Sequence, residues 1–281
     1  MNQTSGKPNN QQVAEPKLKI YFLPNLMTAG NLFCGFVALT KIVEANPASP
    51  LFNHNIKTAL FYILLACIFD ILDGRVARWG GKDSPFGREF DSLADLISFG
   101  VAPAFLVHKI VLKDVFPDFP EVGWFIASIY LICGALRLAR FNCLSAMGAS
   151  APKDFIGFPI PAAAGLVASL TLFLMWWEDK GFEKSDWRYV LFPLLLFLSI
   201  MMVSEVRYPS FKAIDLRAQK GFAKMVMAIL FIGALLILRN KILPIVLPLL
   251  LITYLLYGLI RTRISESTIK KIEEEEIEEE E

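Results

Sequence analysis

The chain has 281 residues, of which 55% are hydrophobic and only 20% are charged, and its formal net charge at pH 7 is +1. This composition is typical of multi-pass membrane proteins and excludes an ordinary soluble domain. At about 20 residues per span, the length accommodates about eight transmembrane helices and no separate soluble domain, and we expect no nucleic-acid partner.

Cysteine and histidine are too few and too scattered for several common chemistries. The four cysteines show no C-x-x-C spacing, which argues against a zinc site or a disulfide framework. The two histidines, His54 and His108, lie near the ends of predicted spans, so a histidine-rich metal site or a Ser-His-Asp hydrolase is not expected. Any chemistry must therefore rest on carboxylates and cations.

Three regions follow from the pattern of apolar residues. Residues 1–16 are rich in Asn, Gln and Pro and predict a disordered lead, residues 17–263 form an all-α membrane domain, and residues 264–281 form a solvated acidic tail. The apolar segments of the membrane domain predict eight transmembrane helices, over residues 21–44, 57–80, 88–112, 122–142, 157–177, 187–206, 219–239 and 242–262.

The distribution of positive charge predicts the orientation of these helices. If both termini are cytoplasmic, most of the 28 Lys and Arg residues fall in cytoplasmic segments, as the positive-inside rule expects. No cleavable signal peptide is expected, since the first apolar run is long and more spans follow it. The chain is therefore predicted to lie in the cell membrane, with residues 70–100 facing the cytoplasm.

Four aspartates in that stretch form the main candidate site. Asp70 and Asp73 are spaced i,i+3, and Asp91 and Asp95 are spaced i,i+4, so each pair lies along one face of a helix. A charged side chain inside a bilayer costs at least about 2.5–3.5 kcal/mol, which makes such residues functional candidates. Four clustered carboxylates need cations, and an all-oxygen set suits Mg²⁺ or Mn²⁺.

Small and basic residues beside the aspartates predict a phosphate-bearing ligand. Gly74, Ala77 and Gly87 remove side-chain bulk, which would let a nucleotide or diphosphate lie against the backbone, while Arg75 and Arg78 can neutralise phosphate oxygens. Two divalent cations held by the carboxylates would stabilise the entering and leaving oxygens of a phosphoryl group during in-line displacement.

The ordered motif Asp-x2-Asp-Gly-x2-Ala-Arg-x8-Gly-x3-Asp-x3-Asp resembles the signature of the CDP-alcohol phosphatidyltransferases. Its eight fixed positions are Asp70, Asp73, Gly74, Ala77, Arg78, Gly87, Asp91 and Asp95. The resemblance implies membrane enzymes that move a phosphatidyl group from CDP-diacylglycerol to an alcohol and release CMP. It also implies a six-helix catalytic core with the last two helices added to it, and a homodimer.

The same resemblance implies a role for each motif residue. Asp70, Asp73 and Asp91 would be the main ligands of two divalent cations, and Asp95, close to the metals, would act as the general base. The CDP-diacylglycerol site would be lined by Asp70, Gly74, Ala77, Arg78 and Gly87. An unperturbed aspartate is too acidic to deprotonate an alcohol efficiently, so the role of Asp95 requires shared carboxylates and a metal-activated hydroxyl.

Further similarity indicates L-serine as the acceptor. Within the family, the phosphatidylserine synthases are the branch that the chain resembles over residues 23–38, 98–106, 134–142, 155–164 and 207–212. Serine is a zwitterion, so its carboxylate needs a cation and its ammonium needs a hydrogen-bond acceptor. The candidates for binding serine or phosphate are Arg137, Arg140, Asn142 and Lys153, of which the two arginines can bind oxygen pairs bidentately.

Two alternatives remain open at this point. The same reaction with choline would favour aromatic or acidic groups over Arg137 and Arg140, and with glycerol 3-phosphate or inositol phosphate it would need a second phosphate pocket. A divalent cation transporter would use the four aspartates as an ion pathway, but it predicts acids spread across the depth of the membrane.

Overall fold

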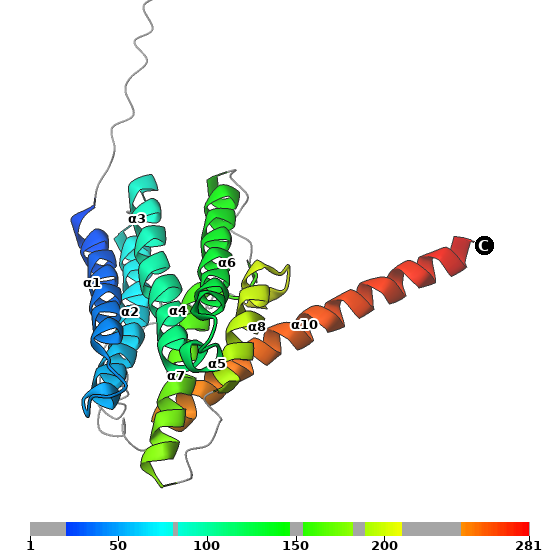
Figure 1. Cartoon of the computed structure of the whole chain (residues 1–281). Coiled ribbons are helices and arrows are strands. Elements are labelled where there is room, and N and C mark those ends of the chain that lie inside the picture. The colour runs from blue at the N-terminus through cyan, green and yellow to red at the C-terminus, as the bar shows by residue number, and fades with distance from the viewer. Residues whose placement is uncertain (1–20, 81–83, 147–153, 182–188, 210–242, 281) are drawn as a thin grey trace, which may run out of the picture.

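The protein is almost entirely helical in a computed structural model (Figure 1). The structure describes residues 21–80, 84–146, 154–181, 189–209 and 243–280. The predicted helix over residues 219–239 and the lead over residues 1–16 lie outside these residues. The elements in chain order are α1 Phe22–Glu44, α2 Phe52–Gly80, α3 Pro85–Asp95, η1 Leu96–Val101, α4 Ala102–Val107, η2 His108–Leu112, α5 Lys113–Val115, α6 Pro120–Ala146, β1 Asp154–Ile156, α7 Ile160–Asp179, α8 Leu191–Val203, β2 Arg207–Pro209 and α10 Leu243–Glu280.

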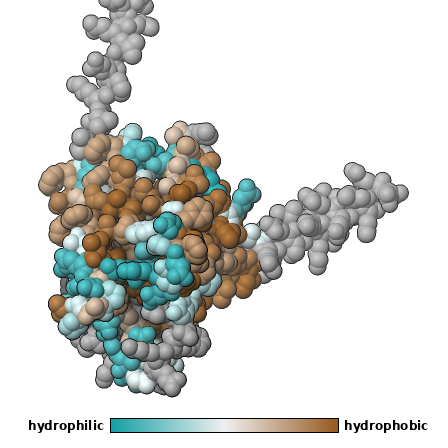
Figure 2. Space-filling view, viewed as in Figure 1, coloured by the Kyte–Doolittle hydropathy of each residue, from teal (hydrophilic) through white to brown (hydrophobic). Residues whose placement is uncertain are grey.

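Six of the described helical segments are long and apolar enough to cross a membrane. They are Phe22–Glu44, Phe52–Val76, Pro85–Val115, Pro120–Ala146, Ile160–Asp179 and Leu243–Thr262. Large apolar side chains such as Phe33 and Phe36 point outward, and apolar residues dominate much of the visible face in Figure 2. The chain is therefore a multi-pass membrane protein, as predicted, although the predicted count of eight spans is not reached within the described residues.

The third span is a continuous helical rod that begins earlier than the predicted residue 88. Ser84 caps it, because its Oγ accepts a hydrogen bond from the Gly87 backbone N–H at 3.0 Å, and Pro85 occupies the first turn. The rod changes from α-helix to the π-helical segment η1 directly after Asp95. Such local widening is frequent at functional sites.

The fifth span begins at Ile160 rather than at residue 157. Pro159 precedes the helix in an extended conformation, and Pro161 lies in its first turn. A backbone N–H in the first turn has no acceptor within the helix, so the N–H that proline lacks costs no helical hydrogen bond there. These prolines therefore lie at the start of the helix and do not kink it.

A short antiparallel sheet is the one addition to the predicted all-α fold among the described residues. Strand β1 pairs with β2, and Phe155 lies opposite Tyr208. Gly157 follows β1 with φ of 78°, a left-handed conformation that favours glycine. The sheet brings the segment before α7 beside the segment after α8.

The last helix, α10, is longer than predicted. It runs from Leu243 to Glu280 and so continues into the acidic tail, which we expected to begin after residue 263. Its first part packs against α7 and β2, and it then leaves the bundle (Figure 1). Leu255 and Gly258 are buried, so this helix is part of the packed bundle.

One end of the bundle gathers the segments that carry the aspartate motif together with parts of two other helices. The start of α1, the end of α2, the start of α3 and the end of α6 lie at this end, which we call the site end (Figure 1). Below it, α1 and η1 touch at Gly35, where an added Cβ would lie 2.7 Å from the Cα of Ser98. The Ser98 hydroxyl donates to the Asn31 carbonyl at 3.0 Å and fixes the same contact.

We predict that Gly35→Ala lowers the stability of the protein and that Gly165→Ala does not. The new methyl group at residue 35 would collide with the Ser98 backbone, which cannot move as a side chain tip can. Overpacking of this kind costs about 1–3 kcal/mol. A methyl group on Gly165 would meet only Leu251 Cδ1 at 3.4 Å. The midpoint of thermal unfolding in detergent measures both, and equal midpoints would contradict the tight α1–η1 contact.

Candidate active site

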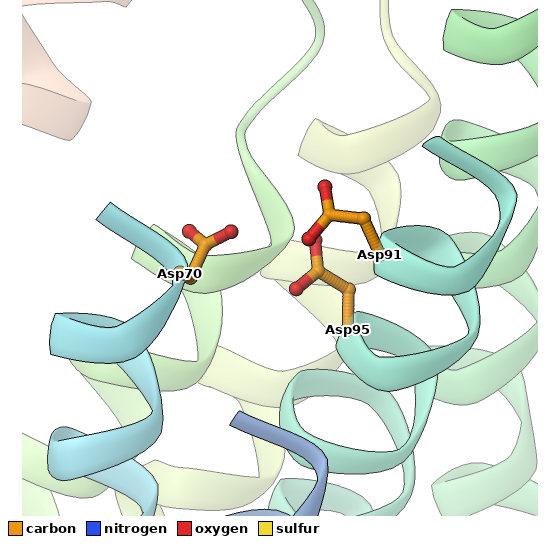
Figure 3. A group of neighbouring side chains, drawn as sticks. All are labelled: Asp70, Asp91 and Asp95. Carbon is orange, nitrogen blue, oxygen red and sulfur yellow. The ribbon is translucent and has the colours of Figure 1, made fainter. Parts of the chain in front are cut away.

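Three of the four predicted aspartates meet at the site end. Asp70 projects from α2 toward Asp91 and Asp95 on α3 (Figure 3), and one carboxylate oxygen from each lies within 4.8 Å of the others. Asp95 is buried, and Asp70 and Asp91 are partly buried. The i,i+4 spacing on α3, and the packing of α1 against both α2 and α3, thus bring together three of the four carboxylates of the motif.

The fourth aspartate, Asp73, lies outside this group of three. It is buried, and its Oδ2 accepts a hydrogen bond from the Thr28 hydroxyl at 3.1 Å. Thr28 lies on α1, so a helix that carries none of the motif holds this carboxylate. The structure therefore places Asp73 one turn beyond the cluster and separates it from the three clustered carboxylates.

Helix α1 also positions Asp95. The Asn31 Nδ2 donates to Asp95 Oδ1 at 3.0 Å, and Asn31 is completely buried. Asn31 follows Thr28 by three residues, so both side chains leave α1 on the same face. Sequence analysis missed both residues, although two polar residues at helical spacing in an apolar span are a signal that could have indicated them.

Several buried polar atoms around the aspartates have no hydrogen-bond partner among the described residues. They are Asp91 Oδ1, Asn31 Oδ1 and Asn25 Nδ2. A buried carboxylate oxygen without a donor is costly unless a cation balances it. The all-oxygen donor set and the unpartnered Asp91 oxygen therefore fit a hard divalent cation such as Mg²⁺ or Mn²⁺.

The structure describes only some of the residues predicted to line the CDP site. Gly87 lies in the first turn of α3, where an added Cβ would be 3.4 Å from Asn25 Oδ1 and 3.2 Å from Ser84 Oγ. Gly74 follows Asp73 on α2 and is partly buried. Ala77 and Arg78 continue α2, but their side chains lie outside the described part of the structure.

Arg137 is the predicted cation whose charge acts on the cluster. It lies on α6, is 8% exposed, and interacts electrostatically with Asp95 and Asp70. Its guanidinium carbon is 5.8 Å from the centre of the Phe141 ring, a cation–π contact one turn along the helix. Among the described residues it has no hydrogen-bond acceptor, so its donors are available to a ligand.

The other three residues predicted to bind serine or phosphate are placed differently. Arg140 donates to the backbone carbonyls of Ile156, Met202, Val203 and Ser204, at 2.9–3.3 Å. These contacts supply partners to the last carbonyls of α8 and join that helix to β1, which supports a structural role. Asn142 Nδ2 donates to the Ser92 hydroxyl at 2.9 Å. Lys153 lies outside the described residues.

Comparison with known proteins identifies the family. A model of the CDP-alcohol phosphatidyltransferase family matches residues 21–206, which include the whole motif. The chain belongs to the CDP-alcohol phosphatidyltransferase family. This agrees with the resemblance carried by the eight motif positions, and α10 lies outside the matched segment.

Curated members of the family with similar sequences carry names that specify an acceptor. A CDP-diacylglycerol–serine O-phosphatidyltransferase of Helicobacter pylori is 34% identical over 243 residues, which cover 86% of this chain and 91% of that protein. An enzyme of the same name from Bacillus subtilis is 34% identical over 68% of this chain and 92% of its own length. An archaetidylserine synthase of Methanothermobacter thermautotrophicus is 33% identical over 66% and 69% of the two chains.

We predict that Thr28→Val destabilises this phosphatidyltransferase and that Thr40→Val on the same helix does not. Both hydroxyls donate to the carbonyl four residues earlier, but only that of Thr28 also donates to a buried carboxylate. Loss of a hydrogen bond to a buried charged group costs about 1–3 kcal/mol. Thermal unfolding in detergent distinguishes the two variants. A similar midpoint for both would mean that Thr28 does not hold Asp73.

Proposed function

We propose that the protein transfers the phosphatidyl group of CDP-diacylglycerol to the hydroxyl of L-serine, giving phosphatidylserine and CMP. The observation that carries this proposal is the cluster of Asp70, Asp91 and Asp95, formed by the motif residues of a CDP-alcohol phosphatidyltransferase. The acceptor follows from the relatives, because enzymes named for serine transfer align with most of the chain.

The carboxylate cluster would hold two divalent cations, Mg²⁺ or Mn²⁺. Asp70, Asp91 and Asp95 supply oxygens close enough to share them, and Asp73 is one helical turn from Asp70. When bound, the cations would neutralise charge on the diphosphate of the substrate and on the leaving CMP. Gly74, Ala77, Arg78 and Gly87 are proposed to line the CDP site, supported by their motif positions.

Asp95 is proposed to accept the proton of the serine hydroxyl. The serine oxygen forms a bond to the phosphorus that carries the diacylglycerol, the bond from that phosphorus to the bridging oxygen breaks, and CMP leaves with that oxygen. The hydrogen bond from Asn31 orients the Asp95 carboxylate for this role. Positioning of an acid or base in this way contributes about 10²–10⁴-fold to a reaction rate.

Arg137 is proposed to bind the serine carboxylate. Arg137 is buried and has no hydrogen-bond acceptor among the described residues, so its guanidinium can donate to an anionic ligand. Arg137 lies near Asp95, and in serine the hydroxyl and the carboxylate are separated by only two carbon atoms. Arg140 and Asn142 are supporting residues in this account, since other protein groups already accept their hydrogen bonds.

The membrane setting is also part of the proposal. The bundle is proposed to lie in the cell membrane with the site end and both termini in the cytoplasm, supported by the basic residues Arg75, Arg88, Arg137 and Arg140 near that end. The lipid tails of the substrate would stay in the bilayer while its CDP group enters the site. A homodimer is proposed on the family resemblance alone.

The geometry favours phosphatidyl transfer over a cation pathway. Three of the four acids meet at one point, whereas a transporter needs acids distributed through the depth of the membrane. Choline, glycerol 3-phosphate and inositol phosphate remain the competing acceptors. A buried arginine suits a carboxylate or a phosphate but not the cationic group of choline.

We predict serine-dependent release of CMP from CDP-diacylglycerol by the purified protein in detergent with Mg²⁺ or Mn²⁺. The assay compares L-serine with choline, glycerol 3-phosphate and inositol phosphate, and a chelator should abolish release because the carboxylates then lack their cations. Release of CMP only with a different acceptor would support the proposed phosphatidyl transfer and refute serine as the acceptor. No release with any acceptor would refute the proposed function.

A further inference from the structure

The side-chain amide of Asn31 has a hydrogen-bond partner for its nitrogen but not for its oxygen. The Nδ2 donates to Asp95 Oδ1 at 3.0 Å, while the Oδ1 accepts no hydrogen bond from any described residue. The residue is completely buried, so bulk water does not supply the missing donor. A buried amide oxygen without a donor is costly, and its position beside the cluster of Asp70, Asp91 and Asp95 makes it a candidate for contact with a ligand.

Two contacts fix the orientation of this amide. A carboxylate only accepts hydrogen bonds, so Nδ2 must face Asp95 and Oδ1 cannot take its place. The backbone at Asn31 is held as well, because its carbonyl accepts a hydrogen bond from the Ser98 hydroxyl at 3.0 Å, and Ser98 is also completely buried. The unpartnered oxygen therefore has a defined position next to the Asp95 carboxylate.

An amide oxygen can only accept a hydrogen bond, so its missing partner must be a donor or a cation. Mg²⁺ at phosphate-binding sites is usually held by carboxylates and by the phosphates of the substrate, which leaves the neutral amide for another group. L-serine carries a hydroxyl, a carboxylate and an ammonium. In the proposed function Asp95 receives the hydroxyl proton and Arg137 binds the carboxylate, so the ammonium is the one group of serine without a partner.

The position of the oxygen also suits the ammonium. In serine, the carbon that carries the hydroxyl is bonded directly to the carbon that carries the ammonium. In the protein, Nδ2 and Oδ1 of Asn31 share one carbon, and Nδ2 is hydrogen-bonded to Asp95. A serine molecule whose hydroxyl meets the Asp95 carboxylate therefore brings its ammonium close to Asn31 Oδ1, where a charge-assisted hydrogen bond can form.

We propose that Asn31 binds the acceptor substrate, with its Oδ1 accepting a hydrogen bond from the ammonium of L-serine. The inference rests on the proposed function and adds to it a residue of α1, a helix that carries none of the aspartate motif. The same amide orients Asp95 through Nδ2 and selects, through Oδ1, an acceptor with an N–H donor beside its hydroxyl. Choline has a quaternary ammonium without an N–H, so it would leave the buried oxygen unpaired and be disfavoured.

The test compares L-serine with 3-hydroxypropanoate, which keeps the hydroxyl and the carboxylate of serine but lacks the ammonium. The KM for serine is measured from the incorporation of radiolabelled serine into lipid. The inhibition constant of 3-hydroxypropanoate is measured against serine in the same assay, so this compound need not be a substrate. The ratio of the inhibition constant to the KM gives the preference for the ammonium.

Three variants are measured beside the unmodified protein. Asn31→Leu and Asn31→Ala both remove the amide, so either one that folds supplies the test. Thr28→Val is the matched control, because Thr28 lies one turn earlier on α1 and also donates to a buried aspartate, but its hydrogen bond is to Asp73 and not to the proposed base. Thermal unfolding in detergent shows which variants fold.

We expect the unmodified protein to bind serine at least about tenfold better than 3-hydroxypropanoate. Asn31→Leu or Asn31→Ala should raise the KM for serine about tenfold and leave the inhibition constant of 3-hydroxypropanoate within about twofold, the usual effect of losing one hydrogen bond to a charged group. Thr28→Val should keep the preference, whatever its kcat. Loss of the donor to Asp95 alone would lower kcat and leave the preference unchanged, so the ratio separates the two roles of Asn31.

Equal binding of the two compounds by the unmodified protein, or an unchanged preference in the variants that lack the amide, would overturn the inference. An unchanged preference together with a higher Mn²⁺ requirement would instead make Asn31 Oδ1 a metal ligand. If the unmodified protein does not form lipid from serine, the proposed function fails and the inference fails with it. If it does, and Asn31→Leu or Asn31→Ala retains the preference of Thr28→Val, only the role of Asn31 is refuted.

Discussion

Three carboxylates whose oxygens lie within 4.8 Å of one another cannot remain together in a membrane-spanning bundle without compensating positive charge. The surrounding structure meets this constraint with hydrogen-bond donors from α1 and a buried cation from α6. Thr28 and Asn31 each donate to one aspartate, and Arg137 lies near Asp70 and Asp95. The remaining negative charge is what would draw divalent cations, and through them the diphosphate of a lipid nucleotide, to this end of the bundle.

The helices around the cluster are fixed by contacts that are individually small. Gly35 lets α1 approach η1, Ser84 sets the start of α3, and Arg140 supplies hydrogen bonds to the end of α8. Each contact locates a helix that carries or faces a site residue. The position of the aspartates therefore depends on the whole site end of the bundle, including the two short strands, and the i,i+3 and i,i+4 spacing alone does not set it.

The sequence predicted the membrane class and the aspartate cluster because both depend on local patterns. Apolar runs indicate spans, and the spacing of Asp91 and Asp95 places them on one face of any helix. The donors to Asp73 and Asp95 lie 45 and 64 residues away along the chain, so only the packed structure shows which side chain meets which acid. The sequence did not predict strand β1, so it could not show that the Arg140 guanidinium donates to backbone carbonyls of β1 and α8.

Crystals of the protein soaked with Mn²⁺ and CDP-diacylglycerol test the central claim most directly, because anomalous scattering locates manganese without reference to activity. The account predicts two anomalous peaks among the carboxylates of Asp70, Asp91 and Asp95, with Asp73 on the side of α2 that faces α1. Peaks at another place, or none at this cluster while the nucleotide is bound, would contradict it.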